Sequence, residues 1–250
     1  MFDLKIAVIS DIHSNRWALE AVLDDIAKRN INNIVDLGDS LYGPLDPAGT
    51  FNILKNENIP SVCGNQDREL IEPVDENSHS TTLKFVLDQL TEEQFDWLRS
   101  LQPVTNPFDN IITFHGCPKN DLEYLIEEVT ETGVIRKSSE RLQNILKNID
   151  RKVILCGHSH VPGSVQLPGG RIIINPGSVG LQAYTDDLPY PHIMESGTPH
   201  ARYCTFHIEN GEIGYEHISV PYDWETASSA AAKNGRKDWA FWLMTGRAIE

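Results

Sequence analysis

The first sixty residues alternate between apolar strand-like runs and segments of helical periodicity. Residues 4–10 are apolar and rich in β-branched side chains, and apolar residues recur at helical spacing over 19–26. A second apolar run at 34–37, a helical segment at 50–56 and a third run at 59–63 follow. This order predicts parallel strands joined by right-handed helical crossovers, which bring the carboxyl ends of the strands to one edge of a sheet.

Side chains that can bind a metal follow several of the predicted strands. The apolar run 153–155, for example, stops at Gly157 and leads into a His-x-His pair. Such a pair alone is as typical of two solvated loop histidines as of a metal site. The other clusters at strand ends favour the metal site, because the sheet brings those ends together. The candidate ligands are Asp11, His13, Asp39, Asn65, His115, His158 and His160.

Seven candidate ligands are too many for one ordinary metal site. They suit two ions that share a carboxylate and lie about 4 Å apart. Carboxylate, imidazole and amide ligands without cysteine indicate two divalent transition-metal ions, manganese first, with iron, nickel or zinc as alternatives. Such a pair clamps phosphoryl oxygens and lowers the pKa of a bridging water, and the resulting hydroxide can attack phosphorus. The expected substrate is therefore a small phosphoester.

The composition narrows the setting and the partners. A formal net charge of −15 disfavours binding to a nucleic-acid polymer or to an anionic membrane surface. No run of about 18 apolar residues is present, and the N-terminus has no cleavage signal. The four cysteines form no CxxC pair, so a cytoplasmic location is expected. The aromatic segment around Trp239 and Trp242 is expected to cap the core or to form the contact of a homo-oligomer.

A single domain is predicted over residues 1–250, because no linker divides the chain. Residues 68–108 read as a helical insertion that lies over the sheet edge and shapes the substrate pocket. Residues 186–199 are rich in proline and aspartate and are expected to form a loop. Residues 201–250 are expected to form a hairpin, with its turn at Asn210-Gly211, and a helix.

The strand-end motifs together resemble those of the calcineurin-like metallophosphoesterases. The motifs, in order, are Asp11-x-His13, Gly38-Asp39, Gly64-Asn65-x-Asp67, His115-Gly116 and Gly157-His158-x-His160. The chain is most similar to the small bacterial and archaeal phosphodiesterase-type members, and the resemblance spans residues 5–180. It implies an α/β fold: a four-layer α-β-β-α sandwich of two mixed sheets flanked by helices.

The resemblance also implies how the ligands are divided between two metals. One metal would be held by Asp11, His13, Asp39 and His160. Asp39 would bridge to the second, which Asn65, His115 and His158 would complete. The residues expected to take part in catalysis are Asp39, Asn65, Gln66 and Asp67.

The chain departs from the family pattern at Gln66, where many members carry a histidine. Glutamine can donate a hydrogen bond but cannot transfer a proton. Loss of general-acid help costs on the order of 10²–10⁴ in rate when the leaving group is poor. The expected substrates are therefore phosphodiesters or phosphoesters with good leaving groups.

Substrate contacts are expected from Asn15, Asn65, Gln66 and Arg68. Asn15 can equally be a helix cap, and Arg68 can equally be a surface arginine. Tyr42 stands where protein phosphatases and diadenosine tetraphosphatases of the superfamily carry an arginine, which disfavours those two activities.

Two alternatives remain at this point. The first is a nucleotide or protein phosphomonoesterase. The second is a non-catalytic metal-binding scaffold, which would be expected to have lost ligands, whereas all seven candidates are present.

Overall fold

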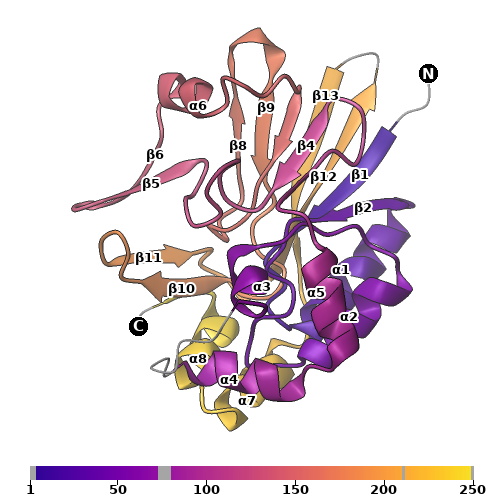
Figure 1. Cartoon of the computed structure of the whole chain (residues 1–250), viewed down its shortest axis with the longest axis vertical. Coiled ribbons are helices and arrows are strands. Elements are labelled where there is room, and N and C mark those ends of the chain that lie inside the picture. The colour runs from indigo at the N-terminus through magenta and orange to yellow at the C-terminus, as the bar shows by residue number, and fades with distance from the viewer. Residues whose placement is uncertain (1–3, 73–79, 210–211, 249–250) are drawn as a thin grey trace.

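Two mixed sheets form the centre of the computed structural model, which describes residues 4–72, 80–209 and 212–248 (Figure 1). The first sheet has the order β13 (Glu212–Val220), β12 (Ala201–Glu209), β1 (Leu4–Ile9) and β2 (Asn33–Asp36). The second has the order β3 (Val104–Thr105), β4 (Ile111–Phe114), β7 (Val153–Leu155), β9 (Ile172–Asn175) and β8 (Gly163–Gln166). β1 and β2 are parallel, as are β4, β7 and β9, and the remaining pairs are antiparallel.

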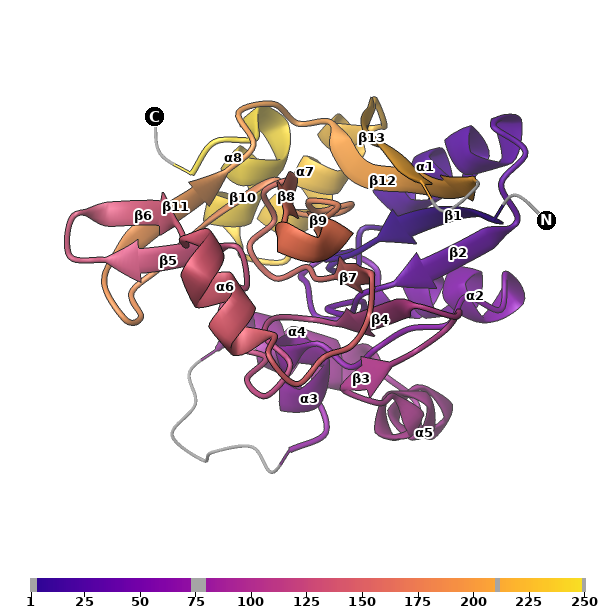
Figure 2. The same cartoon turned by 90° about the horizontal axis from the view of Figure 1, so that it is seen from above.

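Apolar clusters on both faces of each sheet create four layers. Ile6 and Val8 of β1 pack between the sheets, whereas Ala7 and Ile9 pack against α1 (Arg16–Lys28) and α2 (Pro47–Asn56). This alternation is the period of two expected of a strand whose two faces are both covered. On the far side, α6 (Ser139–Ile145) covers the outer face of the second sheet. The predicted α-β-β-α sandwich is confirmed (Figure 2).

The remaining elements surround the ends of the strands. The predicted insertion 68–108 contains α4 (Thr81–Gln89) and α5 (Glu92–Ser100), and the end of α3 (Asn65–Glu69) overlaps its start. β5 (Glu127–Thr130) and β6 (Gly133–Arg136) form one small hairpin, and η1 (Pro168–Gly170) is a short 3₁₀ turn. The C-terminal part contains two helices, α7 (Trp224–Lys233) and α8 (Lys237–Thr245). The single-domain boundaries stay a prediction.

Two element predictions were wrong. Residues 59–63 form no strand, because Pro60 has no N–H to donate and pairing is limited to isolated bridges at Ser61 and Val62. The predicted loop 186–199 contains β11 (His192–Glu195), which pairs antiparallel with β10 (Ala183–Asp186). The proline- and aspartate-rich composition belongs to the short connection between these strands.

The β12–β13 hairpin was predicted correctly and joins the first sheet through β1. Its predicted turn, Asn210-Gly211, lies outside the described residues. Within 4–72, 80–209 and 212–248, no helix has the length and apolar character that crossing a membrane requires.

Candidate metal centre

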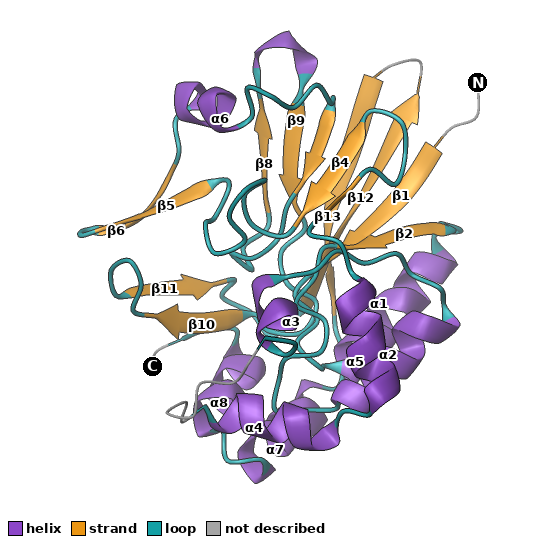
Figure 3. Cartoon of the chain, viewed as in Figure 1, coloured by secondary structure: helices purple, strands orange, loops and turns teal. Residues whose placement is uncertain are grey.

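Loops from both sheets converge at the ends of the strands (Figure 3). The loops after β1 and β2 are joined by hydrogen bonds from Asp11 N to Gly38 O (2.9 Å) and from His13 N to Asp39 O (2.9 Å). The second sheet supplies the loops after β4 and β7, where Gly157 N donates to His115 O (2.7 Å). The strand-end clusters therefore meet in space, as the parallel order of the strands predicts.

Six of the seven predicted ligands form two groups, each with its ligand atoms within 4.8 Å of one another. The first group is Asp11, His13 and His160, and the second is Asp39, His115 and His158. His160 Nε2 lies 3.3 Å from Asp11 Oδ1, and His115 Nε2 lies 3.3 Å from Asp39 Oδ2. The groups adjoin, because Asp11 Oδ1 is also 3.9 Å from His115 Nε2.

Backbone carbonyls orient three of the imidazoles. Nδ1 of His13, His115 and His160 lies 2.9, 2.8 and 2.6 Å from the carbonyl oxygens of Tyr42, Leu37 and Leu181, respectively. A carbonyl oxygen only accepts, so Nδ1 carries the proton and Nε2 points toward the centre of the group. These contacts select the tautomer that a metal ligand needs.

The ligand atoms are arranged to bind a cation rather than to hydrogen-bond with one another. His13 Nε2 and His160 Nε2 lie 3.0 Å apart, and in this tautomer both nitrogens present lone pairs to each other. Asp11 Oδ1, Asn65 Oδ1 and His115 Nε2 are buried without a hydrogen-bond partner. Buried polar atoms without partners are uncommon in folded proteins, and here they are oxygen and nitrogen ligands of the type that first-row divalent metals accept.

The backbone of the ligands is strained. Non-glycine residues at positive φ cost on the order of 1–3 kcal/mol each and gather at functional sites. The ligands in this conformation are Asp11 (φ 55°), His13 (49°), Asp39 (55°), His158 (70°) and His160 (60°). The strained loops also approach each other closely: a Cβ at Gly64 would lie 2.2 Å from Asp39 Oδ1.

The charge states of the ligands depend on burial and on their neighbours. Burial raises the pKa of Asp39, but the larger opposite effect of the adjacent His115 and His13 lowers it to about 2. Burial lowers the pKa of His13 and of His158 to about 4, so both imidazoles are neutral at pH 7. Burial also lowers the pKa of His115, but Asp39 and Asp11 raise it to about 10. Metal binding at His115 would therefore release a proton.

In the Gly64-Asn65-x-Asp67 motif, some side chains line the cavity and one lies in the interior. Asn65 and Gln66 line the same cavity as the ligands, and Gln66 N donates to Asp39 Oδ1 (2.9 Å). Gln66 Oε1 is buried without a partner. Asp67 is fully buried and does not line the cavity. Its Oδ2 accepts from Asp39 N (2.7 Å) and its Oδ1 from Ser40 N (3.0 Å), so it positions the Asp39 loop.

Two predicted substrate contacts lie elsewhere. Asn15 is fully buried: its Oδ1 accepts from Ala18 N (3.1 Å) at the start of α1, and its Nδ2 donates to Gly180 O (2.9 Å). Arg68 donates to both carboxylate oxygens of Asp121 (2.8 and 3.0 Å) and to Glu72 (2.7 Å), and it does not line the cavity. Asn15 is a helix cap and Arg68 is a surface ion-pair residue in this structure.

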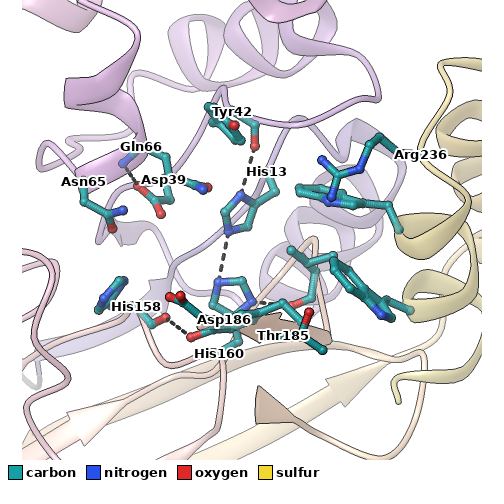
Figure 4. A pocket seen from close by; sticks show the side chains of 14 residues that line it. His13, Asp39, Tyr42, Asn65, Gln66, His158, His160, Thr185, Asp186 and Arg236 are labelled. Carbon is teal, nitrogen blue, oxygen red and sulfur yellow. Dashed lines mark hydrogen bonds between the residues drawn. The ribbon is translucent and has the colours of Figure 1, made fainter. Parts of the chain in front are cut away.

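A cavity of about 270 Å³ opens onto the ligands, and sequence reasoning missed much of its lining (Figure 4). The lining residues that it missed as site residues are Tyr42, Leu181, Tyr184, Thr185, Asp186, Arg236, Trp239 and Trp242. The aromatic pair Trp239 and Trp242 was visible in the sequence, but only as a packing cluster. Nothing in the sequence marks Arg236, which lies far along the chain from every motif.

Comparison with known proteins shows relatives in sequence and in fold. The chain is 29% identical over 257 residues to the uncharacterized protein MJ0912 of Methanocaldococcus jannaschii, with 94% of each covered. Its structure resembles that of a metallophosphoesterase from Sphaerobacter thermophilus, with a TM-score of 0.75, 24% identity, and 98% and 100% of the two chains covered. It also resembles the hypothetical protein PH1004 of Pyrococcus horikoshii OT3, with a TM-score of 0.73, 18% identity, and 98% and 99% covered. These two structural likenesses show the fold.

A family model described as the calcineurin-like phosphoesterase superfamily domain matches residues 4–210. The matched range contains all seven candidate ligands and ends before α7 and α8. The chain therefore belongs to the calcineurin-like phosphoesterase superfamily.

Proposed function

We propose that the protein is a dinuclear metal-dependent phosphoesterase that prefers phosphodiesters or phosphoesters with good leaving groups. The observation that supports it most is the pair of adjoining ligand groups, Asp11–His13–His160 and Asp39–His115–His158. Two divalent ions held there would polarise phosphoryl oxygens and supply a hydroxide nucleophile near neutral pH. Manganese is the proposed metal, with iron, nickel or zinc accepted by the same ligand types.

The charge of the site favours an anionic substrate despite the acidic surface. Asp11 and Asp39 are the only carboxylates in the two ligand groups, so two dications would leave the site locally positive. The net charge of −15 acts over the whole surface and disfavours a nucleic-acid polymer. We therefore propose a small phosphoester as the substrate. The buried free thiols of all four cysteines suit a reducing, cytoplasmic setting.

The preference for phosphodiesters rests on Gln66. Its side-chain amide faces the cavity and can donate a hydrogen bond to a phosphoryl oxygen, but it cannot protonate a departing alkoxide. Asn65, beside it, offers a buried oxygen without a partner. A poor leaving group therefore receives no proton from this part of the site, whereas a good leaving group needs none.

The test is hydrolysis of bis-p-nitrophenyl phosphate against p-nitrophenyl phosphate. The protein is stripped of metal and then given Mn²⁺, with Asp39→Asn as the control variant. We expect Mn²⁺-dependent cleavage that is faster for the diester and is lost in Asp39→Asn, because the variant removes a carboxylate of the second ligand group.

Two results would contradict the proposal. Faster release of phosphate from the monoester would assign the protein as a phosphomonoesterase. Absence of turnover with Mn²⁺, Ni²⁺, Fe²⁺ or Zn²⁺, in protein that binds those ions, would assign it as a metal-binding scaffold.

A further inference from the structure

Helix α8 and the residue before it supply one wall of the cavity, although they lie beyond the range matched by the family model, 4–210. Arg236, Trp239 and Trp242 line the cavity from the start and the first two turns of α8. Trp239, Trp242 and Leu243 belong to an apolar cluster that also holds Leu45 and Leu181 of the body. The wall is therefore packed against the rest of the molecule and has a defined position.

The guanidinium of Arg236 is held in place by three neighbours. Its Nε and Nη2 donate to Asp238 (2.9 and 2.6 Å), and its Nη1 donates to Thr82 Oγ1 of α4. The guanidinium also lies over the ring of Trp239, with its Cζ 5.3 Å from the ring centroid. Arginine has five N–H groups, so one N–H on each terminal nitrogen has no partner among the described residues.

Trp239 separates Arg236 from the metal ligands. The rings of Trp239 and His13 are nearly perpendicular, with centroids 5.7 Å apart, and Arg236 lies over the face of the same indole. In Figure 4, Arg236 is on the opposite side of the cavity from Asn65 and Gln66. An anionic group at Arg236 is therefore a different group from a phosphoryl group bound at the metal ligands.

The other charged groups around the cavity are unsuited to bind a second anion. Arg68, the arginine that the sequence offered as a substrate contact or a surface residue, donates to Asp121 and Glu72 outside the cavity. Asp186 lines the cavity from the end of β10 and cannot attract an anion. Asp238 has a side chain that is 43% exposed, and its contacts orient the guanidinium while leaving two donors free.

We propose that Arg236 binds a second anionic group of the substrate, a phosphate or a carboxylate, while the indoles of Trp239 and Trp242 contact the part that joins the two anions. The substrate class is then a small phosphoester with a second negative charge. The cavity of about 270 Å³ lies at the lower limit of ligand pockets and suits a small molecule. This inference rests on the proposed function, and it extends the substrate recognition of the same site.

Binding of non-hydrolysable phosphonates tests it directly. Phenylphosphonate, 4-carboxyphenylphosphonate and 1,4-phenylenebisphosphonate would be titrated by calorimetry into the Mn²⁺-loaded protein. We expect the two ligands with a second anion to bind about tenfold or more tightly than phenylphosphonate, because hydrogen bonds to charged groups contribute that much. The difference should vanish in Arg236→Gln and survive in part in Arg236→Lys. The carboxylate and the phosphonate arms show which anion is preferred.

Two further variants distinguish anion binding by Arg236 from a purely structural role of this residue. Arg99→Gln removes the same charge from the exposed face of α5 and should keep the wild-type preference. Thr82→Val removes the contact between α4 and the guanidinium but leaves the two free donors, so it should also keep the preference. If Arg236→Gln lowered the melting temperature but kept the preference, Arg236 would be a structural link between α4 and α8 and the inference would be overturned. Equal affinities of the wild type for the three ligands, or no binding, would also overturn it.

Hydrolysis distinguishes failure of this inference from failure of the proposed function. Phenyl p-nitrophenyl phosphate and 4-carboxyphenyl p-nitrophenyl phosphate differ only in the second anion. If both are cleaved at rates that do not depend on Arg236, the proposed function stands and the inference fails. If neither is cleaved, the proposed function fails, and the phosphonate titrations still decide whether Arg236 recognises a second anion.

Discussion

At the scale of single residues, neighbours within one motif have different roles. Asn65 and Gln66 line the cavity, whereas Asp67 is buried and binds the backbone of the Asp39 loop. The sequence predicted all three as catalytic. The spacing of a motif shows that its residues are neighbours, but it does not show which side chain faces the cavity and which faces the interior. The backbone contacts of His13 and His115 were equally hidden, since each joins segments far apart in the chain.

Gln66 leads to a prediction about leaving groups. Gln66→His places a titratable group beside the cavity, so the variant can protonate a poor leaving group. We expect alkyl phosphate hydrolysis to rise by about tenfold or more, with a smaller change for p-nitrophenyl phosphate and bis-p-nitrophenyl phosphate, because p-nitrophenolate leaves without a proton. Gln66→Asn, which shortens the amide without adding a proton donor, is the matched control. No gain in monoester hydrolysis at any pH would contradict this account of Gln66.

Asp36 leads to a prediction about pH. It is buried at the end of β2, where it accepts from Ser40 Oγ (2.6 Å), and burial together with the nearby Asp67 raises its pKa to about 7. The unfolded chain releases this proton near pH 4, so between pH 4 and 7 the native state binds more protons than the unfolded state. The contribution of Asp36 to stability is therefore complete below about pH 4 and is lost as the pH rises to about 7.

Asp36→Asn removes this titration and keeps an acceptor oxygen. Relative to the variant, we expect the wild type to lose roughly 2–3 kcal/mol of unfolding free energy between pH 5 and pH 8, since each pKa unit corresponds to about 1.4 kcal/mol. Urea unfolding of the metal-free wild type and variant at pH 5 and at pH 8 measures this difference. Parallel stability curves for the two proteins would show that Asp36 does not titrate in this range.

At the scale of elements, the strand-end pattern was predictable and the irregular connections were not. The strands that precede Asp11, Asp39, His115 and His158 are buried on both faces, so their apolar runs are visible without any knowledge of contacts. The pairing of β10 with β11 depends on the facing strand, and the short β11 run follows a proline-rich connection that resembles a loop. The opposite error was made at residues 59–63, an apolar run that was predicted as a strand. Pro60 explains why this run forms no ladder.

Asn15 leads to a prediction about the first helix. Asn15→Ala removes the cap of α1 and leaves Gly180 O without its side-chain donor. We expect a loss of about 2–4 kcal/mol of unfolding free energy, since a cap contributes about 1 and an unsatisfied buried acceptor about 1–3. Asn15→Ser keeps the cap and should lose less. The check is to measure urea unfolding of the wild type and both variants together with their KM for bis-p-nitrophenyl phosphate. A raised KM at unchanged stability would make Asn15 a substrate contact after all.

At the scale of the whole molecule, the candidate metal centre joins the two sheets. Asp11, His13 and Asp39 come from loops of the first sheet, and His115, His158 and His160 come from loops of the second. Bound ions would therefore link the two halves of the sandwich. The family motifs predicted this centre from the sequence. The wall formed by Arg236 and α8 was not predictable, because Arg236 reaches the cavity only through packing of the C-terminal helices.

The central claim is that one chain holds two metal ions in adjoining ligand groups. Counting Mn²⁺ bound per chain, by calorimetric titration of the metal-free protein alongside elemental analysis, tests it most directly. The account predicts two ions per wild-type chain, diester hydrolysis that appears as the second ion binds, and fewer than two ions in Asp39→Asn. Full hydrolytic activity with a single bound ion, or saturation of the wild type at one ion per chain, would contradict it.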